Sequence, residues 1–179
     1  GHLRRDALLS RRDAPACGRR TGLGGYAGHS HKYKKKGGSG YLFRTSTVQD
    51  FSGVTGACLL VKTAVYDEMH GLDEQFAVAF NDVDFCLRVR DAGYRIAWTP
   101  YAELIHYESK SRGGDEKDPV KAARFAAEQQ RLYTIHGKEN ILDDPYYNPN
   151  LTRDREDFSE SGDLRNLKEG KVTARWRNA

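Results

Sequence analysis

Two carboxylates stand two positions apart in the segment Asn81-Asp82-Val83-Asp84. A carboxylate held in a cleft can act as a general base that takes a proton from a hydroxyl group. Two carboxylates at this spacing can also approach a Mg²⁺ or Mn²⁺ ion that carries phosphates. The structural alternative is helix capping, in which Asn81 is the N-cap and both acids complement the helix dipole from the first turn.

A second candidate is the small-residue segment Thr55-Gly56-Ala57, which ends an apolar run. A backbone without bulky side chains lets a ligand approach closely, so this segment is a candidate for substrate binding. The alternative is that Gly56 only permits tight packing within a sheet. We favour the binding interpretation.

The elements that must position these residues alternate between strand and helix. Residues 54–61 form a nearly continuous apolar run, which is typical of a strand buried on both faces. Residues 63–70 predict a brief helix that ends at Gly71. A second helix is expected from Asn81 to Gly93, with Val83, Cys86 and Leu87 inward and with Arg88, Arg90 and Asp91 in solvent.

After this helix the pattern continues with short strands at 95–98 and 103–107, separated by Thr99-Pro100. A longer helix is predicted from about Pro119 to His136, and its inner stripe would consist of Ala122, Phe125, Ala126, Leu132 and Tyr133. Residues 144–151 combine prolines and asparagines with a Tyr pair, which predicts an aromatic loop. The alternation predicts an α/β fold with a sheet that looks incomplete.

Charge and composition divide the chain unevenly. Residues 1–40 hold nine glycines and ten Lys or Arg against two Asp, a net charge of +8, so the other 139 residues carry −4. We expect 1–40 to be a basic leader that is mobile or draped over another surface, and we do not expect a nucleic-acid-binding domain. No apolar run approaches the ~18 residues that a membrane span needs. Three cysteines without zinc spacing indicate a reducing, cytoplasmic compartment.

Five linked motifs resemble the acceptor half of family 2 glycosyltransferases. They are Val54-Thr55-Gly56-Ala57-Cys58, Gly71-Leu72-Asp73-Glu74, the segment from Phe80 to Arg88 with Gly93-Tyr94, the segment from Pro100 to Ser109 with Ser111-Arg112-Gly113, and Asp144-Pro145-Tyr146-Tyr147-Asn148-Pro149-Asn150-Leu151. They extend over roughly residues 40–158 and look like bacterial enzymes that build rhamnose-containing or O-antigen-type surface polysaccharides. The resemblance implies a GT-A fold and inverting transfer from a nucleotide-diphosphate sugar to a hydroxyl acceptor.

The resemblance also implies roles for single residues. Asp82 lies in the position of the family's acidic pair and is our first choice for the base. Asp84 beside it is either a second catalytic candidate or a residue that only orients its neighbours. His106 lies 24 residues beyond Asp82, where related enzymes place a histidine that completes the shell of a divalent metal. Its alternative role is a hydrogen bond inside the fold or a contact with the acceptor. Arg112 would neutralise the leaving diphosphate, and its alternative is a surface arginine in a mobile loop. Thr55, Gly56 and Ala57 would contact acceptor or donor.

Two departures from the family pattern shape the interpretation. Asn81 stands where many relatives have Glu, and the family's nucleotide-binding part with its metal-binding DxD motif has no counterpart in this chain. We rank a metal site at Asp82-Val83-Asp84 lower, because these residues are expected to open a helix. Mn²⁺ or Mg²⁺ is therefore expected only together with the missing part, and the chain alone is expected to be nearly inactive.

The sequence thus predicts a partial GT-A-like α/β fold with a leader at 1–40, an acceptor and base region at 41–158 and a polar tail at 159–179. The expected partners are a nucleotide-diphosphate sugar and a saccharide or lipid-linked saccharide acceptor. A cytoplasmic protein is expected, with membrane contact through the leader as a further option. The alternative is a non-catalytic carbohydrate-binding or assembly module that keeps a remnant of the fold.

Overall fold

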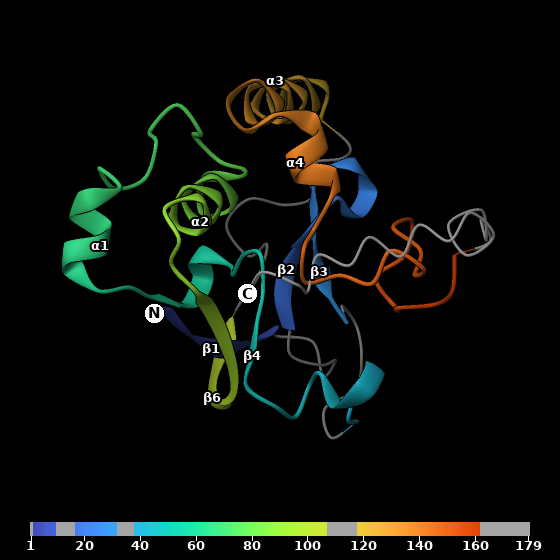
Figure 1. Cartoon of the computed structure of the whole chain (residues 1–179). Coiled ribbons are helices and arrows are strands. Elements are labelled where there is room, and N and C mark those ends of the chain that lie inside the picture. Colours follow the sequence, from blue (N-terminus) through green and yellow to red (C-terminus); the bar gives the residue numbers. More distant parts are fainter. Residues whose placement is uncertain (1, 10–16, 32–37, 107–117, 162–179) are drawn as a thin grey trace.

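The strands form two sheets in the computed structural model, which describes residues 2–9, 17–31, 38–106 and 118–161 (Figure 1). The larger sheet has the order β4-β6-β1-β5, with β1 at His2–Leu9, β4 at Gln49–Asp50, β5 at Leu59–Leu60 and β6 at Ile96–His106. β1 runs parallel to β6, and the other two pairs are antiparallel. The described chain is therefore mixed α/β, as predicted.

The smaller sheet is a hairpin of β2 (Cys17–Thr21) and β3 (Ala27–Ser30), which the short 3₁₀ helix Leu23–Gly25 joins. This differs from the expected mobile leader, because Arg20, Leu23 and Ala27 are buried. Long-range hydrogen bonds hold the hairpin: Thr21 N–H donates to Asp144 Oδ2 at 2.9 Å, and Arg19 N–H donates to the Gly53 carbonyl at 2.7 Å. The Lys34-Lys35-Lys36 run lies outside the described residues.

Three of the helices agree with the sequence prediction. α1 is Thr63–Glu68, α2 is Asn81–Asp91 and α3 is Pro119–His136, and α4 (Lys138–Leu142) follows α3 directly. Asp118 caps α3 through its carboxylate, which accepts from the Val120 and Lys121 amides at 3.0 and 3.5 Å. The N-cap of α2 differs from the expectation, because it is Phe80 in a left-handed conformation, and Asn81 is the first residue of the helix.

α2 is the central helix of the core. On one side it packs into a cluster of Ala27, Phe76, Phe80, Val83, Leu87, Leu132 and Ile141, and on the other into a cluster of Val54, Val65, Phe85, Cys86, Val89 and Ile96. All residues from Asp82 to Leu87 are buried. A helix that is buried nearly all round needs partners for its polar side chains, so the expected amphipathic helix with a solvated Arg88 is not what forms.

Three expected strands differ from the structure. Residues 54–61 do not form one buried strand: 56–58 make a 3₁₀ turn, and Leu60 in β5 is 55% exposed. The expected pair 95–98 and 103–107 is instead the single strand β6. Its register to β1 jumps from the pair Arg4–Trp98 to the pair Asp6–Glu103, so residues 99–102 bulge from the ladder at Pro100, which has no N–H to donate.

The inner face of α3 is shifted from the predicted stripe. Phe125, Leu132 and Tyr133 do pack inward, but Ala122 and Ala126 are exposed. Glu128 and His136 take the buried positions. Apolar periodicity alone predicts that these two polar residues face solvent. They can be buried because their hydrogen-bond partners lie on α2 and in the 73–80 loop.

The C-terminal part of the described chain is an ordered loop around the hairpin. Tyr147, Leu151 and Phe158 form a small core cluster, and residues 150–152 pair with 159–161 through backbone hydrogen bonds. The Arg20 guanidinium lies between the Tyr147 and Phe158 rings at 4.0 and 4.2 Å from their centroids. The expected polar tail thus begins inside the fold at 159–161, and residues 162–179 lie outside the described part.

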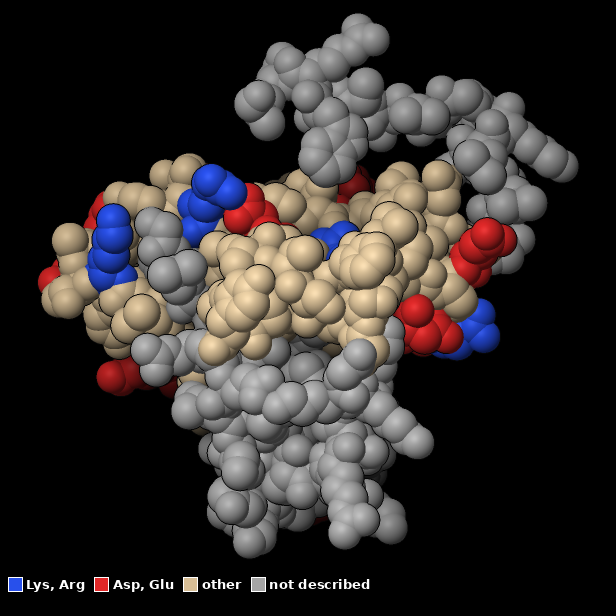
Figure 2. Space-filling model, turned by 90° about the horizontal axis from the view of Figure 1, so that it is seen from below, with Lys and Arg blue, Asp and Glu red and all other residues tan. Residues whose placement is uncertain are grey.

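On the face shown in Figure 2, basic and acidic side chains are interspersed around a broad area of other residues. No single basic patch dominates that view. Across the described helices, no segment is long and apolar enough to cross a bilayer.

Candidate active site around Asp82

Asp82 lies in the first turn of α2 and is 6% exposed. Its Oδ2 atom accepts a hydrogen bond of 2.8 Å from the Gly56 amide. The same oxygen forms an ion pair of 3.2 Å with Arg19 Nη2 from β2. Oδ1 has no hydrogen-bond partner among the described residues, so one oxygen of this carboxylate is fixed and the other is free to accept a proton.

Thr55, Gly56 and Ala57 are brought next to Asp82, although they are 25 to 27 residues away in the sequence. Thr55 is buried and caps the short 3₁₀ turn, since its Oγ1 accepts from the Ala57 amide at 3.4 Å. A Cβ atom on Gly56 would lie 3.4 Å from Asp82 Cβ, an ordinary van der Waals contact, so the backbone of this segment runs directly beside the helix start. In the structure this segment holds Asp82 through the Gly56 amide. The predicted contact of the segment with substrate stays a prediction.

Asp82 lines a pocket of about 870 Å³ between the β2–β3 hairpin, the start of α2, α3 and the 154–157 loop. Its wall includes Arg19, Tyr26, His29, Asn81, Asp82 and Phe125. Tyr26 and Phe125 are in edge-on contact, with ring centroids 5.3 Å apart. Aromatic rings beside carboxylates and amides are groups that can contact the faces and the hydroxyl groups of a sugar.

The pocket carries more acidic than basic groups. Asp82, Asp154, Glu156 and Asp157 stand against Arg19 and Arg155, a formal charge of −2 at neutral pH. Such a pocket favours an uncharged, hydroxyl-rich ligand over a diphosphate. The hairpin and the 154–157 loop were not predicted as parts of a site, because no motif in either segment signals it.

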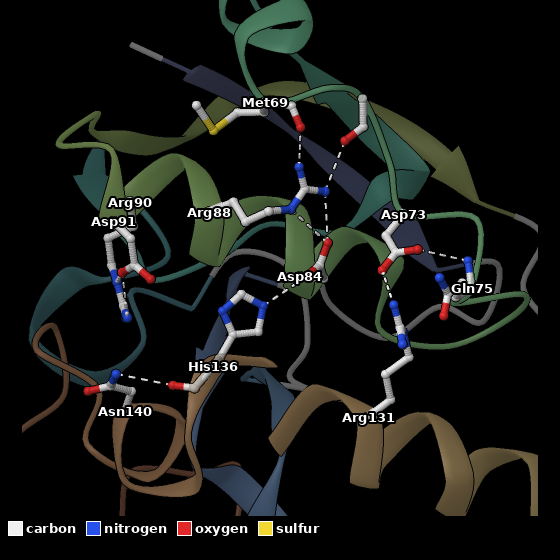
Figure 3. A network of polar contacts seen from close by, with 11 residues as sticks. Met69, Asp73, Gln75, Asp84, Arg88, Arg90, Asp91, Arg131, His136 and Asn140 are labelled. Atoms are coloured by element: carbon white, nitrogen blue, oxygen red, sulfur yellow. Dashed lines mark hydrogen bonds and ion pairs between the residues drawn. The ribbon is translucent and has the colours of Figure 1, made fainter. Parts of the chain in front are cut away.

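Asp84, two residues further along α2, is buried between Arg88 and His136 (Figure 3). Its Oδ1 is 2.8 Å from His136 Nε2, and its Oδ2 accepts from Arg88 Nε at 2.9 Å and Arg88 Nη2 at 2.7 Å. Arg88 also donates to the carbonyls of Met69 and Gly71. Both oxygens of Asp84 are therefore occupied, which supports the orienting role over the catalytic one.

The pKa of Asp84 reflects these partners. Burial alone raises the pKa of this carboxyl, but the hydrogen bonds from His136 and Arg88 and the charge of Arg88 outweigh burial and lower it. Asp84 therefore stays ionised in the core, where it ties α2 to α3 and to the loop after α1. Figure 3 shows a second tie, in which Arg131 on α3 donates to Asp73 Oδ2 at 2.8 Å.

A buried carboxylate that the sequence did not single out is Asp144. It accepts from the Ser52 hydroxyl at 2.7 Å, the Tyr146 amide at 2.8 Å and the Thr21 amide at 2.9 Å. Burial raises its pKa against the effect of these three donors. Its contacts join the loop to Ser52 and to the hairpin. In the sequence it opens the last of the five motifs, but no role was predicted for its side chain.

Two predicted site residues are not tested by this geometry. The side chain of His106, at the end of β6, and all of Arg112 lie outside the described part of the chain. Among the side chains that are described, no group of three or more His, Cys, Asp or Glu could hold a metal ion. The predicted metal ligand and the predicted diphosphate contact stay predictions.

The chain is similar to parts of longer proteins. It is 47% identical over 138 residues to an uncharacterized protein, y4gI, of Sinorhizobium fredii, a match that covers 76% of this chain and 15% of that protein. It is 32% identical over 133 residues to O-antigen biosynthesis protein RfbC of Myxococcus xanthus, covering 74% of this chain and 10% of RfbC.

A third relative is an N-acetylglucosaminyl-diphospho-decaprenol L-rhamnosyltransferase of Mycobacterium tuberculosis, which is 32% identical over 80 residues. This match covers 45% of the chain and 24% of the relative. No family model and no solved structure matches the chain. The names of RfbC and the rhamnosyltransferase suggest a glycosyltransferase-like family. This chain spans a quarter or less of the length of each of the three relatives.

Proposed function

We propose that this chain is the acceptor-binding and base-bearing part of an inverting glycosyltransferase that acts in bacterial surface polysaccharide synthesis. The observation that carries the proposal is the Asp82 carboxylate, which lines an 870 Å³ pocket with Oδ2 held and Oδ1 free. The proposal is supported by two relatives, one named for O-antigen biosynthesis and one named as a rhamnosyltransferase. The donor would be a nucleotide-diphosphate sugar and the acceptor a saccharide or a lipid-linked saccharide.

In this proposal an acceptor hydroxyl donates a hydrogen bond to Asp82 Oδ1. As the hydroxyl oxygen attacks the anomeric carbon, its proton passes to Oδ1 and the bond from that carbon to the diphosphate breaks, with its electron pair leaving on the phosphate oxygen. Attack on the face opposite the leaving group inverts the anomeric centre. The acidic excess of the pocket suits the neutral acceptor better than the diphosphate.

A divalent Mn²⁺ or Mg²⁺ ion would neutralise charge on the diphosphate when bound. The described side chains do not gather enough ligands for it. We propose His106 as one ligand and Arg112 as a further contact to the phosphates, both to act with residues beyond those described. A cytoplasmic site of action, at the inner face of the membrane, fits a lipid-linked acceptor.

The test is Asp82→Asn in the full-length protein, assayed with a panel of nucleotide-diphosphate sugars by release of nucleoside diphosphate. The side-chain amide of this variant can still accept a hydrogen bond from the Gly56 N–H, but it cannot accept the proton of the acceptor hydroxyl. Turnover should therefore fall about 10²- to 10⁴-fold with donor affinity little changed. Asp91→Asn is the matched control, because Asp91 lies at the exposed end of the same helix.

Two outcomes would contradict the proposal. Near-normal turnover of Asp82→Asn would make Asp82 a helix-capping residue and place the base elsewhere. A wild-type protein that binds saccharides but turns over no donor would favour the non-catalytic binding module. Thermal melting of both variants checks that the fold is intact.

A further inference from the structure

Arg19 is a pocket residue that sequence motifs do not identify. Its backbone is fixed in β2, where its N–H donates to the Gly53 carbonyl at 2.7 Å and its register partner in β3 is His29. Its side chain is 20% exposed and lines the pocket beside Asp82. Arg19 therefore presents a guanidinium from a rigid strand to the carboxylate that we propose as the base.

The guanidinium of Arg19 has one anionic partner among the described residues, which is Asp82. Arg19 Nη2 lies 3.2 Å from Asp82 Oδ2, and Arg19 Nε is buried with no hydrogen-bond partner in the described part of the chain. Because the Arg19 guanidinium is largely buried and has this single counter-charge, Asp82 orients the guanidinium, and the guanidinium orients the Asp82 carboxylate in return.

Asp82 needs this second contact to keep one orientation. The terminal torsion of an aspartate side chain is broad, so a single hydrogen bond from the Gly56 amide leaves the carboxylate plane able to rotate. With the amide and Arg19 both on Oδ2, the plane is fixed and Oδ1 is the oxygen left for a ligand.

We propose that Arg19 is a positioning residue for Asp82, which holds Oδ2 so that Oδ1 faces the acceptor hydroxyl. Its neighbour Arg20 cannot replace it, because successive side chains of a strand point to opposite faces and Arg20 is stacked between Tyr147 and Phe158. The inference rests on the proposed function only for its effect on turnover.

The first experiment is independent of activity and measures hydrogen exchange of the Gly56 amide in this chain. The amide is protected by its bond to Asp82 Oδ2, so its exchange reports whether the carboxylate stays in place. In Arg19→Gln we expect about tenfold faster exchange at Gly56, and in Arg19→Lys, which keeps the charge but not the planar fork, a smaller rise. Arg95→Gln is the matched control, because Arg95 also pairs with a single aspartate, Asp50, but lies outside the pocket.

The second experiment measures turnover of the same variants in the full-length protein, with the donor that supports the fastest turnover of wild type. A positioning role lowers kcat about tenfold in Arg19→Gln with KM for the donor unchanged, and Arg19→Lys restores part of the loss. Thermal melting curves check that all variants fold.

Unchanged exchange at Gly56 in Arg19→Gln would overturn the proposal. A raised donor KM with unchanged kcat would also overturn it, because Arg19 would then bind the donor. If wild type turns over no donor, the proposed function fails, while the exchange at Gly56 still decides whether Arg19 holds Asp82.

Discussion

Asp84→Asn tests whether the buried network on α2 is a structural centre of the fold. The side chain of Asp84 is 2% exposed and that of His136 is 5% exposed, while Arg88 is 27% exposed. Removing one partner of a buried ion pair costs about 3–5 kcal/mol. Because Arg88 is partly solvated and the amide keeps one acceptor oxygen, we expect a loss of about 2–3 kcal/mol in the free energy of unfolding.

Urea denaturation of this chain measures that loss, and the pH dependence of stability identifies its origin. The pKa of Asp84 is lowered from its ordinary value of 3.8, so its stabilising contribution is present above that pH and is lost as the pH falls through the lowered value. Wild type should therefore lose stability below pH 3.8 more steeply than Asp84→Asn.

The control for this prediction is Asp91→Asn on the same helix. Asp91 is 55% exposed in an ion pair of 3.4 Å with Arg90, and exposed pairs of this kind contribute about 0–1 kcal/mol. A cycle that combines Asp84→Asn with His136→Asn should show coupling, because the two side chains share one contact of 2.8 Å. If Asp84→Asn lost no more stability than the control, the network would be incidental to the fold.

Two further predictions concern the hairpin. Gly18→Ala should destabilise the protein by about 1–3 kcal/mol in urea denaturation, because its Cβ would lie 2.2 Å from the buried Phe51 ring; a loss below about 0.5 kcal/mol would contradict this packing. Arg20 is 2% exposed, so limited trypsin digestion followed by mass spectrometry should show slow cleavage after it. Cleavage there as fast as in an unfolded peptide would restore the expectation of a mobile leader.

The helices could be predicted because their signals are local. Pro119 at the first position of α3, Asp118 before it and Gly137 after it are neighbours of the helix in the sequence. The hairpin could not be predicted, since glycine and arginine composition indicates a mobile segment. Its order depends on partners more than a hundred residues away, such as Asp144, which is 123 residues from Thr21.

In the candidate site, too, some residues can be predicted from local sequence, and others only from contacts between distant segments. Motif context identified Asp82, and the same context left Asp84 undecided between catalysis and orientation. His136 decides in favour of orientation, because it lies 52 residues from Asp84 in the sequence and 2.8 Å from it in space. Arg19 lies in no sequence motif, and only its contact with Asp82 shows that it belongs to the candidate site.

The two acids of α2 have different surroundings because of helix geometry. Residues two positions apart in a helix do not face each other, so Asp82 and Asp84 point to different surroundings and are poorly placed to share one metal ion. Asp84 could act as a base only by giving up His136 or Arg88, which would release the contacts that hold α3 and the 69–71 loop. Asp82 can accept a proton on Oδ1 without losing either of its contacts, since both are on Oδ2. The packing around α2 thus supports general-base chemistry at Asp82 and a structural duty at Asp84.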